Sequence, residues 1–237
     1  GAWTAFAKAS ELDQVTPLSL QALAELALAE GQADAALDYF AQAKERDATY
    51  APPYYALAEV YMAEAKPDQA LGELDALLKQ NSGLAEAYLR RALIQDSIGK
   101  KKAARADYAK AIALNITKPL AYNNLAWLLA TGPGEFEKAI ELSYKAVELS
   151  PRGSPEGAQF LDTLGWIYHL NNQPQRARGE LEKARDLAPD DPVILYHLAV
   201  VYKELGNASA ATKLFNTVLE MKPDAALAAE IRLALDK

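Results

Sequence analysis

The chain has 237 residues, 51% of them hydrophobic, and a formal net charge of −7 at pH 7. Because it has no cysteine, thiol catalysis, cysteine-ligated zinc and disulfide bonds are excluded. The acidic balance argues against nucleic acid as a partner. No apolar run approaches the roughly eighteen residues that a membrane-spanning helix needs, so we expect no membrane insertion.

The hydrophobic pattern is helical. In residues 158–191, apolar side chains recur at helical spacing before Asn171 and again after Pro174, with a polar turn between them. The Ala-rich, Gly-poor composition also favours close-packed helices, and no stretch alternates as a strand would. One such helix pair cannot bury its own apolar faces, so we predict an all-α protein of stacked helix pairs.

A period of 34 residues runs through the chain and is visible in two ladders: Tyr54, Tyr88 and Tyr122, and Ala36, Ala70 and Ala104. This period divides the chain into six repeats: 17–50, 51–84, 85–118, 119–153, 158–191 and 192–225. The fourth repeat carries one extra residue in its turn, and residues 154–157 are predicted to be a linker before the fifth. Both insertions fall in turns, where added length costs little.

The ends of the chain continue the pattern. Ala2, Phe6 and Ala9 extend the second-helix ladder backwards, so residues 1–16 are predicted to be the second helix of a truncated preceding repeat. Residues 226–237 carry one more apolar stripe, which is either a capping helix or a truncated first helix. A natural array ends in caps with polar outer faces, so we expect the chain to be a piece of a longer array.

Each repeat has the same order of key residues: a large residue, Leu with a small residue, Tyr, Gly at the turn, Ala, an aromatic, Ala and finally Pro. In the fifth repeat these include Leu164, Gly165, Tyr168, Ala177 and Pro189. This pattern resembles the tetratricopeptide repeat across essentially the whole chain. The resemblance implies a right-handed α-solenoid of stacked helix-turn-helix units, in which the shared residues serve packing. Arg91 stands where other repeats have Leu, a departure that the pattern does not explain.

The resemblance also implies that the first helices line a concave groove, with positions two, five, nine and twelve of each repeat facing it. We call these the groove positions. In the third repeat they include Leu89, Leu93 and Asp96. The candidate peptide-binding residues at these positions are Tyr55, Glu59, Met62, Asn123, Trp127, Asp162, Trp166, His169, Tyr196 and Lys203.

Trp127, Trp166 and Tyr196 would form an aromatic band in this groove. Aromatic rings with a few polar groups are typical anchors for a bound peptide. The alternative for each ring is packing against the neighbouring repeat. His169 is interpreted either as a core histidine or as a hydrogen-bond donor in the groove.

The sequence lacks a catalytic constellation. It has only two histidines, His169 and His197, and neither lies in an HExxH motif. The glycines of Gly132-Pro133-Gly134 fit no phosphate-binding motif. The only basic run, Lys100 to Lys102, follows a predicted turn and is interpreted as a solvated helix start. We therefore expect no enzymatic activity, no cofactor and no metal.

Some tetratricopeptide proteins hold a partner's C-terminal carboxylate with Lys, Arg and Asn on successive first helices. This chain offers Arg90, Arg91, Asn123 and Asn124, but the matching Lys and Arg positions of the adjoining repeats are missing. A clamp for a chaperone tail is therefore not favoured.

The later repeats resemble a narrower group. Residues 123–127, 161–166 and 196–199 are similar to bacterial tetratricopeptide proteins of exopolysaccharide export and PEP-CTERM surface-protein systems. We predict a scaffold that binds a peptide or protein segment in its groove within a bacterial envelope or export assembly, periplasmic or membrane-associated. Two alternatives stay open. One is a cytoplasmic co-chaperone or regulatory adaptor, and the other is a structural spacer that self-associates through exposed repeat ends and has no groove ligand.

Overall fold

The computed structural model describes residues 16–132, 134–151 and 153–236. These residues form thirteen helices and no strand, which confirms the predicted all-α class. Residues 1–15 of the predicted preceding helix lie outside the described residues. The chain divides into two compact units, residues 1–116 and 117–237.

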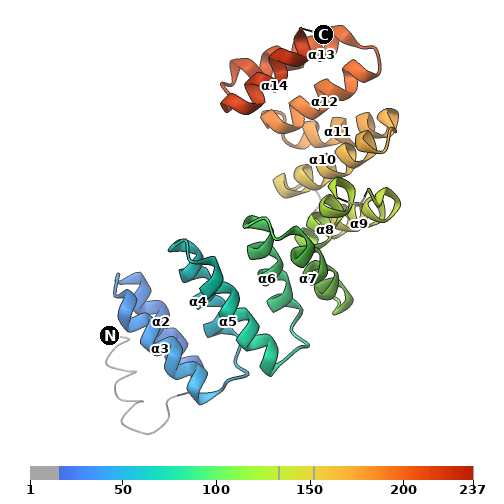
Figure 1. The fold of residues 1–237 in the computed structure, drawn as a ribbon. Helices are drawn as coiled ribbons and strands as arrows, with labels where there is room; N and C mark the ends of the chain where they lie inside the picture. The colour runs from blue at the N-terminus through green and yellow to red at the C-terminus, as the bar shows by residue number, and fades with distance from the viewer. Residues whose placement is uncertain (1–15, 133, 152, 237) are drawn as a thin grey trace. The chain divides into compact units, whose positions relative to one another are not determined.

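The first unit consists of three helix pairs. They are α2 (Pro17–Ala29) with α3 (Ala33–Arg46), α4 (Pro52–Ala63) with α5 (Pro67–Gln80), and α6 (Ala85–Ser97) with α7 (Lys101–Ala113). The two helices of each pair lie side by side (Figure 1). The second helices α3 and α5 also pack on the first helix of the next pair, so the pairs stack.

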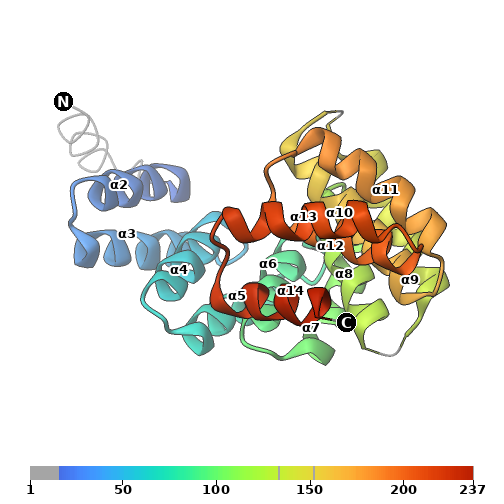
Figure 2. The same cartoon turned by 90° about the horizontal axis from the view of Figure 1, so that it is seen from above.

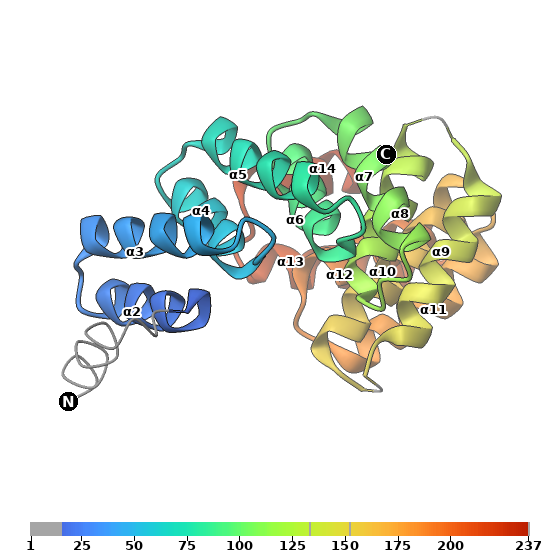
Figure 3. The same ribbon diagram turned by 90° about the horizontal axis from the view of Figure 1, so that it is seen from below.

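The second unit contains three more pairs and one further helix. They are α8 (Pro119–Thr131) with α9 (Phe136–Leu149), α10 (Pro155–Leu170) with α11 (Pro174–Leu187), α12 (Pro192–Glu204) with α13 (Ala208–Glu220), and α14 (Ala225–Leu235). Figures 2 and 3 show these helices from above and from below. α10 contacts both first helices beside it, α8 and α12, and α14 packs on α13.

Local sequence sets where the helices begin. Proline occupies the first turn of several of them, where its missing N–H leaves no hydrogen bond unmade. The prediction of a linker at residues 154–157 is wrong, because α10 already begins at Pro155. The Ser154 hydroxyl accepts a hydrogen bond from the Gly157 amide at 3.0 Å, so this segment is the capped first turn of a longer helix.

The turn inside most pairs holds a residue with left-handed backbone geometry. Its φ is +75° at Gly31, +76° at Gly99 and +78° at Gly206, and Ala65 and Asn172 adopt φ of +57° and +55° in two other pairs. This region costs an ordinary L-residue about 1–2 kcal/mol and glycine nearly nothing. The turn therefore ends the first helix at a fixed point of the repeat.

Small residues let the helices of a pair approach closely. Those on the second helices, Ala36, Ala70, Ala104, Ala139 and Ala177, are completely buried. The two helices approach closely at Gly165 in α10: a Cβ added there would lie 2.6 Å from Leu181 Cγ and 3.2 Å from the Ala177 carbonyl oxygen in α11. Only glycine fits there without displacement of the Leu181 side chain.

Arg91, the departure from the repeat pattern, has a structural reason. Its guanidinium donates to both carboxylate oxygens of Asp107 in α7, at 2.6 and 2.7 Å, and to Asp75 in α5 at 2.6 Å. Asp107 is only 6% exposed. The side chain of Arg91 therefore neutralises a buried carboxylate and ties three helices together, where a leucine would only fill space.

Replacing Gly165 with alanine tests the close helix contact. The new methyl group must displace Leu181, so Gly165→Ala is expected to lower the free energy of unfolding by about 1–3 kcal/mol. Gly179→Ala is the matched control, because a Cβ at this α11 position meets nothing within 4 Å. The control should be neutral or gain up to about 1 kcal/mol. Equal urea midpoints for the two variants would contradict the packing described.

A second pair of variants tests the Arg91 interaction. Arg91→Leu leaves the Asp107 carboxylate buried without its counter-ion, and we expect a loss of about 3–5 kcal/mol in urea unfolding. The double variant Arg91→Leu/Asp107→Leu removes both charges and should recover most of that loss. If the double variant is as unstable as Arg91→Leu, the buried carboxylate is not the cause.

Candidate functional site

In the first unit, the first helices α4 and α6 line an open cavity of about 320 Å³. Its lining consists of Ala58, Glu59, Met62, Arg90, Leu93 and Ile94. Glu59, Met62 and Leu93 are groove positions, so the structure brings these three sequence-predicted residues together. The cavity combines apolar lining residues, its floor, with the charged side chains of Glu59 and Arg90, its edge. This suits a peptide whose apolar side chain enters the cavity while its polar backbone meets the charged edge.

Arg90 organises the charged edge of this cavity. Its guanidinium lies over the Tyr55 ring, 4.7 Å from the ring centre, and Nε donates to a Glu86 carboxylate oxygen at 2.9 Å. Nη1 forms an ion pair with Glu59, whose side chain is 69% exposed. Burial raises the pKa of Tyr55, and the Glu86 carboxylate adds to that shift. Tyr55 thus supports Arg90 and is not a freely exposed ring.

In the second unit, α10 and α12 bring five side chains together, and we call them the Trp166 cluster: Asp162, Trp166, His169, His197 and Glu204. The His197 ring stacks on the Trp166 ring at 3.9 Å between centres and 23° between planes. The His169 ring lies 4.5 Å from the same indole. Each imidazole is held by a carboxylate: His197 Nδ1 is 2.8 Å from Asp162 Oδ1, and His169 Nδ1 is 2.8 Å from Glu204 Oε2.

These contacts fix the orientation of both imidazoles. An ionised carboxylate only accepts hydrogen bonds, so Nδ1 of each ring carries the hydrogen. In the neutral rings Nε2 is then an acceptor. The sequence allows His169 either core packing or hydrogen-bond donation into the groove; in the structure its Nδ1 donates to Glu204. Asp162 is 9% exposed, and its carboxylate is hydrogen-bonded to His197.

Tyr196 and Lys203, also predicted for the groove, mainly make contacts within the protein. The Tyr196 ring lies 6.0 Å from that of Phe215 and 5.8 Å from that of His197. Burial, together with a hydrogen bond to Glu230, raises the pKa of Tyr196 to about 12. The Lys203 ammonium donates to the Ala234 carbonyl in α14. Both side chains join α12 to the helices beside it.

The α8 candidates are less connected. Trp127 is 37% exposed, whereas Asn123 is half-buried and its Nδ2 lies 3.4 Å from the Asn124 Oδ1. Among the described residues, the Asn123 amide oxygen is buried without a hydrogen-bond partner. The assignment of Leu89 to the groove is wrong, because its side chain is 2% exposed and belongs to the core. Part of each first helix packs against neighbouring helices.

The groove positions do not include position six of the repeat, although residues at that position contribute to both sites. Arg90 occupies it in the third repeat and His197 in the sixth, and each reaches a groove residue of the preceding repeat. The signal was present: Asp162 and His197 are 35 residues apart, as are His169 and Glu204. Side chains that are one repeat plus one residue apart can therefore meet between the first helices of adjacent repeats.

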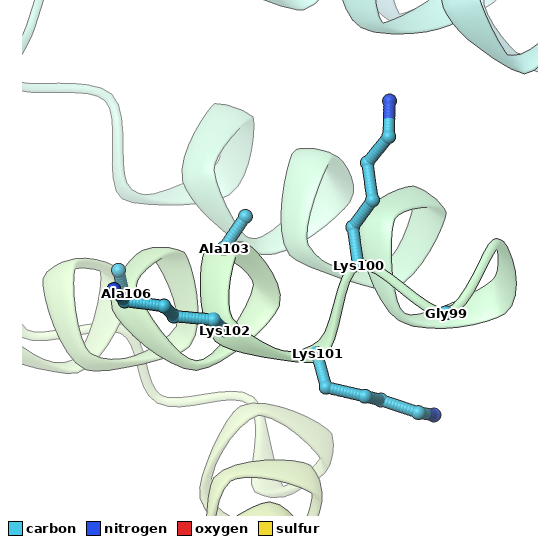
Figure 4. Close-up of a pocket in the computed structure, with 6 residues that line it drawn as sticks. All are labelled: Gly99, Lys100, Lys101, Lys102, Ala103 and Ala106. Carbon is cyan, nitrogen blue, oxygen red and sulfur yellow. The ribbon is translucent and has the colours of Figure 1, made fainter.

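The basic run Lys100–Lys102 lines a separate cavity of about 630 Å³ with Gly99, Ala103 and Ala106. Figure 4 shows its three lysine side chains pointing in different directions. Lys101 pairs with Asp96 at 2.5 Å and Lys100 with Asp68 at 3.4 Å. The lysines do not converge on a common point, as an anion site would require.

Within residues 16–132, 134–151 and 153–236, no three His, Asp or Glu side chains gather as a metal site would need. In that part of the chain, no helix combines the length and apolar character needed to cross a membrane.

Family models identify the repeat. A model described as tetratricopeptide repeat matches residues 27–94 and 168–234, and a second model with that description matches residues 85–115. Together they span more than half of the chain. Among curated proteins, no relative matches.

Solved structures share the architecture. The Cut9–Hcn1 hetero-tetramer of the APC/C matches with a TM-score of 0.72 and 18% identity, over 100% of this chain and 46% of that one. YrrB, described as a TPR protein with an unusual peptide-binding site, matches at 0.67 and 20%, over 81% and 97%. PilW, a type IV pilus biogenesis factor, matches at 0.66 and 21%, over 77% and 84%. At these identities the likeness shows the fold alone.

Proposed function

The chain belongs to the tetratricopeptide repeat family, and from this premise we propose that it is a non-catalytic scaffold that binds a segment of a partner protein along its first helices. The repeat fold supports protein–protein interaction in general. Binding in the groove in particular is supported by the cavity between α4 and α6.

The chemistry of this cavity suits a peptide. At about 320 Å³ it is near the small end of ligand pockets, a size that favours one large apolar side chain over a whole cofactor. Met62, Leu93 and Ile94 would contact that side chain. At the edge, Arg90 has further N–H groups and the exposed Glu59 has further acceptor capacity, so a peptide C=O and N–H could both be satisfied.

We also propose that the partner belongs to a bacterial envelope or export assembly, where this chain is periplasmic or membrane-associated. The support is the resemblance of the later repeats to bacterial export systems and the structural likeness to PilW, described as a pilus biogenesis factor. The likeness to YrrB, described as peptide-binding, supports the groove mechanism. The chain spans less than half of the Cut9–Hcn1 chain that it matches, so nothing of that assembly is transferred.

A substitution in the cavity tests the groove. Peptides are selected from a displayed random library on the native protein, and their affinities are then measured for two variants. Met62→Glu places a charge in the apolar floor and should weaken binding by at least about tenfold. Met221→Glu is the matched control, because this other methionine is 38% exposed at the end of α13. Equal affinities for both variants would contradict binding in the cavity.

Location has its own test. Fractionation of cells that carry the gene, followed by immunodetection of the native protein, should find it with the envelope fraction. Recovery wholly in the cytosol would overturn the envelope proposal and favour the adaptor alternative, without bearing on the groove.

A further inference from the structure

The Trp166 cluster presents flat rings and hydrogen-bond acceptors. Glu204 contributes a partly exposed carboxylate, and the two imidazoles contribute Nε2 when neutral. The 9%-exposed Asp162 orients His197 and adds its negative charge. Within the described residues, these carboxylates are paired with the imidazoles and with no lysine or arginine. The cluster is partly open to solvent, since the side chains of His169 and Glu204 are 23% and 31% exposed.

The first unit shows what such a surface binds. There, an aromatic ring and two carboxylates on facing first helices hold the guanidinium of Arg90, which stands at position six. In the second unit, position six of the sixth repeat is His197 instead. An aromatic ring and two carboxylates are present there as well, in contact with His197 and His169 and not with an arginine of the chain.

We propose that the Trp166 cluster binds the guanidinium group of an arginine side chain in the partner segment. This inference rests on the proposed function, because it assumes that the first-helix surface receives a protein segment. Charge complementarity favours it: the cluster holds two carboxylates and two imidazoles, and the chain as a whole carries −7.

The geometry selects arginine over lysine. A guanidinium is planar, stacks on aromatic faces and donates five hydrogen bonds in its plane, whereas an ammonium is a compact, strongly hydrated charge. The His197 ring already stacks on the Trp166 indole at 3.9 Å and the His169 ring lies 4.5 Å from it, so the preference for arginine rests on hydrogen bonding. The imidazole nitrogens and the carboxylates beside them match the several in-plane donors of a guanidinium.

Short capped peptides provide the test. Acetyl-Gly-Arg-Gly-amide is titrated into ¹⁵N-labelled native protein, and the indole N–H resonance of Trp166 is followed, assigned by its absence in Trp166→Phe. We expect a saturable shift of this resonance. Acetyl-Gly-Lys-Gly-amide should bind several-fold more weakly, and acetyl-Gly-Glu-Gly-amide should not bind.

Two matched variants separate recognition from general electrostatics. Glu204→Gln keeps a carbonyl oxygen that can accept from His169 but removes the charge, and we expect about tenfold weaker binding of the arginine peptide. Glu220→Gln removes the same charge at the end of the second helix α13 and should leave binding unchanged. Circular dichroism and urea unfolding check that both variants keep the native fold.

Three results would each overturn the inference: no saturable shift with the arginine peptide, equal affinity for the arginine and lysine peptides, or equal loss in the two glutamate variants. Any of them would leave the Trp166 cluster as an internal brace between α10 and α12. The cavity between α4 and α6 is tested separately through Met62, so failure here is distinguishable from failure of groove binding.

Discussion

The two helices of a pair touch at short range, and the stacking of the pairs follows from that contact. Gly165 lies against Leu181 and Ala177, and buried alanines take the corresponding places in the other pairs. Because those positions are small, the helices meet at short range and their large side chains are left to fill the space between pairs. Stacking then repeats with the period of the sequence. It is this repetition that sets first helices beside one another and creates surfaces such as the one between α4 and α6.

Much of the fold follows from the sequence, since it depends on repeated residues. The helical class came from apolar spacing, and the turn from glycine at a recurring point where φ is positive. The 34-residue period wrongly predicts a linker at residues 154–157, because Ser154 and Pro155 carry a local helix-start signal that the period does not contain. Arg91 was unexplained because its partners Asp75 and Asp107 lie on other helices, and a repeat pattern does not show pairing across helices.

The candidate sites were less predictable. The groove positions include Glu59, Met62 and Trp166, but not Arg90 or His197, which lie one place beyond position five of their repeats. Leu89 occupies a groove position and is buried, whereas Asp162 occupies another and is paired with His197. A fixed list of positions treats every first helix as equally exposed. Which side chains meet depends on the stagger between neighbouring helices and on the charge partners available, and these are properties of the packed structure.

Binding of a partner segment along the first helices can be observed directly by NMR. When a library-selected peptide is added to the labelled protein, the largest backbone amide shifts should fall in α4 and α6, around the cavity lined by Met62 and Arg90. Shifts confined to the second helices, or to the α2 and α14 ends, would contradict it.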